Sequence, residues 1–244
     1  MSRVGVIGDP HEPFCHPMYR AFVQDTFRKN RIDHIHFVGD IVDNHALGFW
    51  DHDPDGMSAG DEADAALQTI AKWTKTFPKA TVCIGNHDER PERVAHKYGL
   101  PRRNLKDYAT VWETPGWKWA FEHIIDGVYL THGTGTSGED AAMKNAIRRM
   151  MSVAQGHTHA FAGVKYHCNP LFRVFGLNAG CGIDIDRYAF AYGKPFANRP
   201  VLGCGVVIDG EEAHFHPMPC GRGEAYHRSR AGVKKRVRYV ARKK

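Results

Sequence analysis

Val4-Gly5-Val6-Ile7-Gly8-Asp9-Pro10-His11 begins with a short apolar run and ends in polar residues. The apolar run is typical of a buried strand, and Gly8 permits a tight turn or a close backbone approach that directs the next side chain inward. The same arrangement occurs at four later places in the chain. These are Gly39-Asp40-Ile41-Val42-Asp43-Asn44, Gly85-Asn86-His87-Asp88-Glu89, His132-Gly133 and Gly156-His157-Thr158-His159.

Strand and helix patterns alternate around these five motifs, which predicts a layered α/β fold. A turn at Asp126-Gly127 also predicts a hairpin that includes the alternating Trp117, Trp119 and Phe121 and ends before His132. In open α/β sheets, ligands bind beyond the carboxyl ends of the strands, so the motifs should meet at one edge. Strands are predicted at 4–7, 35–38, 81–84, 153–155 and in short segments from 162 to 218, and helices at 17–30, 62–77 and 139–151.

The side chains of the motifs are those of a metal site. Together they offer two Asp, one Asn and four His as ligands, with a further Asp and His for chemistry. Mixed carboxylate and imidazole ligands suit divalent manganese, iron, zinc or nickel. Each motif alone is also typical of a core histidine or a turn aspartate, but the complete set could hold a pair of metal ions and hydrolyse a phosphate ester.

The ordered set resembles the signature of the calcineurin-like metallophosphoesterase superfamily. That signature is Gly-Asp-x-His, Gly-Asp-x-x-Asp, Gly-Asn-His-(Asp/Glu), a His followed by Gly, and Gly-His-x-His, and the resemblance runs from Asp9 to His159. It implies a single-domain, four-layer α-β-β-α sandwich with two mixed sheets and a dinuclear metal site at their edge. Gly176-Leu177-Asn178-Ala179-Gly180 is similar to a strand-end Asn-x-Gly found in many members.

The resemblance also implies roles for individual residues. Asp40 would bridge two divalent metal ions, preferably manganese, and a water between them would become the hydroxide that attacks phosphorus in line. His87 corresponds to the catalytic histidine that protonates or stabilises the leaving oxygen, and Asp43 would orient its imidazole. Asp88 is either a support for a ligand or an ordinary turn residue. One metal would be held by Asp9, His11 and His159, and the other by Asn86, His132 and His157.

Two departures from the pattern narrow the branch of the family. The Ser/Thr protein phosphatases carry Gly-Asp-x-Val-Asp-Arg-Gly and Gly-Asn-His-Glu, whereas Asn44 and Asp88 stand at the Arg and Glu positions here. The sequence is more similar to bacterial and phage phosphoesterases and nucleases. Asn44, Arg90 and Arg93 are the candidate substrate contacts, although a solvated helix start is the preferred interpretation of both arginines.

The positive charge of the chain is concentrated at its end. Residues 222–244 hold ten of the 33 Lys and Arg residues and one acid, Glu224, which leaves residues 1–221 near neutral. We therefore expect a catalytic domain over 1–221 and a basic tail over 222–244. The tail either binds a nucleic-acid backbone or is a disordered, solubilising terminus.

Two further features have competing interpretations. Asp51 to Glu62 fits an EF-hand calcium loop, but Pro54 and Ser58 argue against it, so an acidic rim that caps the following helix is favoured. Trp112, Trp117 and Trp119 could stack on bases, whereas packing on the core is favoured for the last two.

The composition indicates an intracellular protein. No run approaches the roughly 18 apolar residues of a membrane span, and the first strand begins too early for a cleaved signal peptide. The six scattered cysteines, without a Cys-x-x-Cys pair, are typical of reduced thiols. A cytoplasmic location without a membrane partner is therefore expected.

Three functions agree with the sequence. The leading hypothesis is a phosphodiesterase or nuclease acting on nucleic acid or nucleotides. The second is a phosphomonoesterase acting on a small metabolite or a nucleic-acid end, and the third is an inactive scaffold. The presence of both His87 and Asp43 argues against the scaffold. Diester and monoester hydrolysis use the same core residues, so the sequence leaves substrate, metal identity and oligomeric state open.

Overall fold

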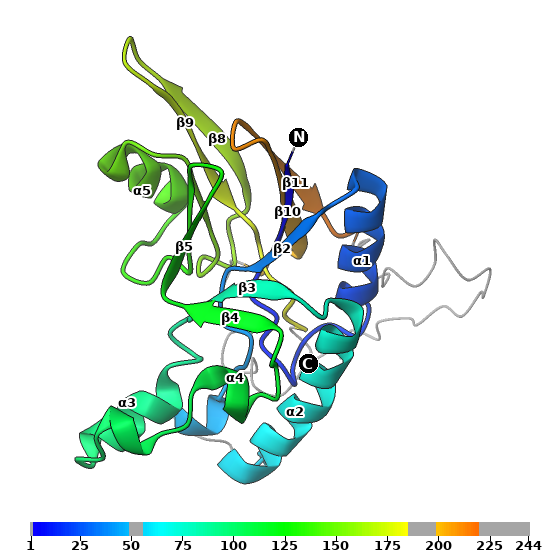
Figure 1. Cartoon of the computed structure of the whole chain (residues 1–244), viewed down its shortest axis with the longest axis vertical. Helices are drawn as coiled ribbons and strands as arrows, with labels where there is room; N and C mark the ends of the chain where they lie inside the picture. The colour runs from blue at the N-terminus through cyan, green and yellow to red at the C-terminus, as the bar shows by residue number, and fades with distance from the viewer. Residues whose placement is uncertain (1, 49–55, 185–198, 220–244) are drawn as a thin grey trace, which may run out of the picture.

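Two stacked β-sheets form the centre of the computed structural model, which describes residues 2–48, 56–184 and 199–219 (Figure 1). The first sheet has the order β11-β10-β1-β2-β3-β4. Its strands β1 to β4 are parallel, and β10 and β11 are added as antiparallel neighbours. The strands are β1 (Arg3–Ile7), β2 (His34–Phe37), β3 (Ala80–Cys83), β4 (Trp117–Ala120), β10 (Gly203–Ile208) and β11 (Glu212–Pro217).

The second sheet has the order β5-β6-β7-β9-β8. Its central strands β6, β7 and β9 are parallel, and both edge strands are antiparallel to their neighbours. The strands are β5 (Glu122–Ile125), β6 (Val128–Thr131), β7 (Val153–Gln155), β8 (Gly163–Cys168) and β9 (Arg173–Asn178). Both sheets are therefore mixed, as predicted.

Helices cover the outer faces of the two sheets. On the first sheet, α1 (Tyr19–Asn30) and α2 (Ala59–Thr76) bury Tyr19 and Trp73 against Phe37. On the second sheet, α5 (Ala141–Arg149) packs against β7 and β9. Between the sheets lies a separate apolar layer to which both contribute, including Val6 and Leu177. This arrangement confirms the four-layer α-β-β-α sandwich.

Four short helices connect these layers. They are η1 (His45–Leu47), α3 (Arg90–Lys97), η2 (Arg102–Asn104) and α4 (Tyr108–Val111).

The structure corrects the predicted hairpin. The turn at Asp126-Gly127 joins β5 to β6 as expected. The Trp117–Ala120 segment, however, is β4 of the first sheet and lies parallel to β3. Alternation indicates that a strand has two different faces, and it does not determine the strand's partner.

The start of α2 also differs from the prediction. The helix begins at Ala59 because Ser58 caps it, accepting the backbone N–H of Asp61. Glu62 is therefore inside the helix, where its buried carboxylate accepts the backbone N–H groups of His45 at 2.6 Å and Ala46 at 2.8 Å. Glu62 thus holds η1 in place, and it is not part of the N-terminal cap of α2. Most of the acidic loop, residues 51–55, lies outside the described residues.

The three tryptophans considered for base stacking pack into the fold. Trp112 and Trp117 are buried, so the structure excludes base stacking by Trp112. Trp119 is partly buried and stacks on Tyr108 with ring centroids 5.4 Å apart.

Two further observations concern the cysteines and the helices. The five cysteines in the described ranges form no disulfide, and four of them are buried: Cys15, Cys83, Cys181 and Cys204. Within the described part of the chain, no helix combines the length and apolar character that a membrane span requires.

Candidate metal centre

The five motifs meet at one edge of the sandwich because each follows a parallel strand. The loops after β1, β2 and β3 come from the first sheet, and those after β6 and β7 come from the second. Parallel strands present their carboxyl ends on the same side, so residues up to 150 positions apart in the chain become neighbours. The site is therefore a direct consequence of the strand order.

The backbone of these loops is unusual at the functional positions. His11, Asp40, Asn44 and His157 have left-handed conformations, with φ between 46° and 68°. Such conformations cost about 1–3 kcal/mol each and persist where the surrounding structure holds them. They aim these side chains into the site.

Two motif glycines leave room for a carboxylate from another motif. A Cβ added at Gly85 would lie 2.1 Å from Asp40 Oδ1, and one added at Gly156 would lie 2.0 Å from Asp9 Oδ1. Both distances are far below van der Waals contact, so only glycine fits without displacing the carboxylate. The sequence predicted this close approach without identifying the groups that approach.

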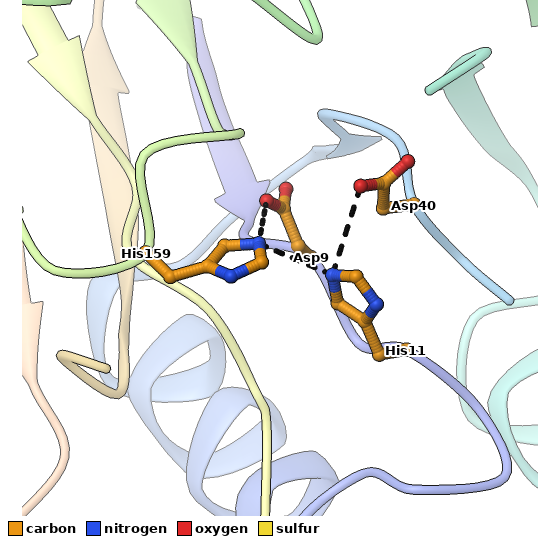
Figure 2. A group of neighbouring side chains, drawn as sticks. All are labelled: Asp9, His11, Asp40 and His159. Carbon is orange, nitrogen blue, oxygen red and sulfur yellow. Dashed lines mark hydrogen bonds and ion pairs between the residues drawn. The ribbon is translucent and has the colours of Figure 1, made fainter. Parts of the chain in front are cut away.

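One group of candidate ligands is formed by Asp9, His11, Asp40 and His159 (Figure 2). One donor atom from each of the four lies within 4.8 Å of the others. The Nε2 atoms of His11 and His159 are 3.1 Å apart, and His159 Nε2 is also 3.1 Å from Asp9 Oδ2. His11 Nε2 is 3.6 Å from Asp40 Oδ2. All three predicted ligands of the first metal therefore surround the predicted bridge.

A second group lies on the other side of Asp40. His132 Nε2 is 3.2 Å from Asp40 Oδ2, 3.0 Å from Asn86 Oδ1 and 3.1 Å from His157 Nδ1. Asp40 Oδ2 is thus shared between the two groups, which is the position expected of a bridging carboxylate. All seven predicted ligands are brought together.

The donor set fits divalent cations. Asp9 Oδ1 is buried without a hydrogen-bond partner, which is costly for a carboxylate oxygen. His132 donates its Nδ1 proton to the Val38 carbonyl oxygen and His11 donates its Nδ1 proton to Asp43, so both Nε2 lone pairs face the site. Facing imidazole nitrogens and an unpartnered carboxylate oxygen are what a shared cation would satisfy.

The charges of the site point the same way. Burial raises the pKa of Asp40, but the His132 and His87 imidazoles outweigh it and hold this pKa well below its usual value. Burial opposes a charge on His132, but Asp40 and Asp9 raise the pKa of His132 to about 10. Two buried carboxylates that stay ionised and stabilise a positive charge on a neighbouring imidazole also favour a metal cation.

Asp43 has two partners. Its Oδ1 lies 2.7 Å from His11 Nδ1 and 3.0 Å from His87 Nδ1. Burial would raise the pKa of Asp43, but the hydrogen bonds from both histidines hold it far below the usual value. The predicted contact with His87 is present, and the contact with His11 is an addition that links the candidate catalytic histidine to a candidate metal ligand.

Arg90 is not a solvated helix start, which corrects the preferred interpretation. Its guanidinium donates to the carbonyl oxygens of Asp43 at 2.8 Å and Asn44 at 3.2 Å, and Nη2 is 3.1 Å from His87 Nε2. Asn44 itself donates its amide to the His87 carbonyl oxygen at 2.9 Å. Arg93 is exposed one turn further along α3. Two of the three predicted substrate contacts therefore hold the His87 loop.

Two buried polar side chains support the loops: Asp88, for which the sequence left two roles open, and Gln155, which the sequence did not single out. Asp88 accepts the backbone N–H groups of Gly85 at 2.8 Å and Val42 at 3.2 Å, and burial raises its pKa to about 7. Fully buried Gln155 donates to Thr136 Oγ1 at 3.2 Å, next to the His132 loop. Asp88 supports the ligand loops through their backbone and not through a ligand side chain.

Comparison with known proteins identifies the family. The calcineurin-like phosphoesterase model matches residues 2–154, which is more than half of the chain. The chain therefore belongs to the calcineurin-like phosphoesterase family and is a metal-dependent phosphoester hydrolase. No curated protein matches it.

Several solved structures are similar in fold at low sequence identity. A metallophosphoesterase from Sphaerobacter thermophilus is 14% identical over 89% of this chain and 88% of that chain, with a TM-score of 0.47. Vacuolar Protein Sorting 29 from Cryptosporidium parvum is 10% identical over 88% of this chain and 97% of that chain, with a TM-score of 0.45. The phosphoesterase YfcE from E. coli is 12% identical over 84% and 88%, with a TM-score of 0.41.

Proposed function

We propose that this protein is a phosphodiesterase that acts on nucleic acid or nucleotides with two divalent metal ions, preferably manganese. The observation that carries the proposal is that the Arg90 guanidinium is held by contacts within the protein. Three contacts hold its guanidinium against the backbone of Asp43 and Asn44 and against His87. A terminal phosphate carries about −1.5 to −2 charge near neutral pH and is gripped well by a bidentate arginine. A diester carries one negative charge and needs no such grip.

Each candidate residue has a distinct part in this proposal. When bound, the two cations acidify a water and neutralise phosphate oxygens. His87 donates its Nδ1 proton in a hydrogen bond to Asp43, which directs Nε2 toward the site, 4.0 Å from Asp40 Oδ2. Burial lowers the pKa of His87, but Asp40 and Asp43 outweigh it and raise this pKa, so the ring that is protonated on both nitrogens can donate its Nε2 proton to the leaving oxygen. Arg93 stays a proposed substrate contact. The proposed metal ligands are Asp9, His11, Asp40, Asn86, His132, His157 and His159.

The test compares hydrolysis of a chromogenic phosphodiester with hydrolysis of the matching monoester, with manganese and then with iron, zinc or nickel. Asp40→Ala serves as the control that removes the bridging carboxylate and should be inactive on both. A preference for the diester supports the proposal. A preference for the monoester contradicts it and favours a phosphatase. If a fully metal-loaded protein hydrolyses neither, the phosphodiesterase is contradicted and the scaffold is favoured.

We also propose that residues 1–221 are the catalytic domain and that 222–244 are a nucleic-acid-binding tail. The tail lies outside the described residues, and its ten basic residues support the proposal. Truncation after Gly221 should weaken nucleic-acid binding, with a smaller dependence on salt. Unchanged binding would contradict the role of the tail.

A further inference from the structure

A second concentration of positive charge begins inside the candidate site. Residues 90–106 contain six Lys or Arg residues and a single acid, Glu92. The first of the six, Arg90, contacts His87, and α3 then extends about 12 Å at 1.5 Å per residue. In Figure 1, α3 projects from the sheets beside α4. The charge therefore forms a path that leads outward from the metal centre.

Much of this charge is not neutralised. Glu92 forms an ion pair with Arg102 and accepts a hydrogen bond from the Tyr108 hydroxyl. Lys97, Arg103 and Lys106 are all exposed. Across residues 2–48, 56–184 and 199–219, no carboxylate forms an ion pair with any of these three. Such a surface attracts a polyanion.

An exposed aromatic ring lies among these cations. The Tyr98 side chain is 80% exposed and directly follows α3. Lys97 Nζ lies 5.9 Å from the centre of the ring. Proteins that bind single-stranded nucleic acid combine a basic path for the backbone with aromatic rings on which bases stack. An acidic protein surface would make use of the cations but has no need of the open ring.

We propose that residues 90–106 form a docking surface for a single-stranded polynucleotide whose scissile phosphate lies at the metal centre. Lys97, Arg103 and Lys106 contact the phosphates beyond the cleaved bond, and an unpaired base stacks on Tyr98. This inference rests on the proposed phosphodiesterase function, which it extends from a reaction to a substrate class.

The test uses the full chain, loaded with manganese, and a fluorescent phosphorothioate oligonucleotide that resists hydrolysis. Its length of about 20 nucleotides exceeds the usual site size of a single-strand binding fold. The variant K97Q/R103Q/K106Q removes three charges from the docking surface. Fluorescence anisotropy between about 50 and 200 mM salt then gives the salt dependence of binding. The slope should be lower by about 2 than in the unsubstituted protein, because each lost single-strand phosphate contact removes about 0.7.

A matched control removes the same charge elsewhere. K29Q/K75Q/K79Q changes three exposed lysines near the ends of α1 and α2, at the amino ends of β2 and β3 and thus at the opposite edge from the site. The proposal requires this control to keep its slope. An equal loss in both triple variants would show that only net charge matters and would overturn the proposal, as would an unchanged slope in K97Q/R103Q/K106Q.

The role of Tyr98 is tested separately. Tyr98→Ala should weaken binding by roughly fivefold to a hundredfold, since one stacked base contributes about 1–3 kcal/mol. Tyr98→Phe keeps the ring and should bind like the unsubstituted protein. Equal binding by Tyr98→Ala would overturn the stacking contact. Binding of a polyglutamate peptide as tightly as the oligonucleotide would overturn the assignment to nucleic acid.

Failure of this inference is distinguishable from failure of the proposed function. Hydrolysis of the small chromogenic diester reports only on the metal centre and should be equal in the unsubstituted protein and in K97Q/R103Q/K106Q. Normal diester hydrolysis with an unchanged oligonucleotide slope overturns the docking surface alone. Absent diester hydrolysis overturns the proposed function, whatever the slope.

Discussion

The two sheets contribute different chemistry to the candidate centre. The loops of the first sheet supply both carboxylates, Asp9 and Asp40, which are almost completely buried. The loops of the second sheet supply only imidazoles, and the His159 side chain is 27% exposed. The first sheet thus fixes the negative charge that attracts cations, and the second adds imidazole ligands, among them the partly exposed His159 (Figure 2). Substitutions on the two sides should therefore differ in kind.

The largest effect should come from the bridging position. Asp40→Asn keeps the shape and an oxygen for the His87 N–H but removes the shared charge, so metal should be lost from both groups of ligands. Activity should fall at least about a hundredfold, because several kcal/mol of transition-state stabilisation depend on the metals. His159→Gln removes one neutral ligand and should retain about half of the metal. Metal analysis of both purified variants measures this, and equal metal loss would contradict the division between the sheets.

A substitution at His87 should change the rate of the reaction without changing metal binding. His87→Gln should retain the metals, since the ring contacts Asp43 and Arg90 and is not among the predicted ligands. Its kcat on the chromogenic substrate should fall by about 10²–10⁴-fold through loss of the proton donor. Full activity with normal metal content would remove His87 from the proposed mechanism.

The sequence predicted which motif residues would lie together, because each motif depends on local information. A strand followed by a Gly-Asp or Gly-His turn is visible in a few residues, and parallel strands then bring the turns together. The resemblance paired Asp9 with His159 across 150 residues, and the two side chains are in contact in the structure. The four layers followed from the resemblance.

What the sequence did not predict depends on contacts between distant segments. The contact of Arg90 with His87 arises from where α3 begins relative to the loop after Asp43. The placement of β4 beside β3 was missed because alternating tryptophans fit either sheet. Buried Gln155 gave no signal, since a polar residue at the end of a strand looks like the start of a loop.

A substitution at Asp43 tests whether this one carboxylate supports both metal binding by His11 and proton donation by His87. Asp43→Asn keeps an oxygen at the position of Oδ1 but removes the negative charge that this oxygen presents to both imidazole N–H groups, so the hydrogen bonds that hold His11 and His87 should both weaken. Metal affinity and activity should both fall by about 10–100-fold, the usual cost of losing such a supporting contact.

Asp88→Asn is the matched control for this variant. Asp88 is equally buried, but it accepts backbone N–H groups and not imidazoles. Its replacement should lower thermal stability with a smaller change in metal affinity. If Asp88→Asn lost as much metal affinity as Asp43→Asn, the special role of Asp43 would be contradicted.

The smallest effect compares one glycine from each sheet. The added Cβ of Gly85→Ala would lie 2.1 Å from Asp40 Oδ1, and that of Gly156→Ala would lie 2.0 Å from Asp9 Oδ1, so the two clashes are similar. Overpacking of this kind costs about 1–3 kcal/mol, so each variant should lower Tm by several degrees, at about 2–4 °C per kcal/mol for a chain of this size. Gly60→Ala, in the first turn of α2, would place its Cβ 3.8 Å from Ser58 Oγ and should leave Tm unchanged or higher.

The comparison becomes sharper when both glycine variants are measured with and without a chelator. Both carboxylates come from the first sheet, so the two variants should weaken metal binding alike although the substituted glycines lie on different sheets. The gap in Tm between the metal-loaded and chelated forms should therefore shrink in both and stay the same in Gly60→Ala. A loss confined to Gly156→Ala would instead place the decisive constraint on the second sheet, since only its loop would then control the geometry of the centre.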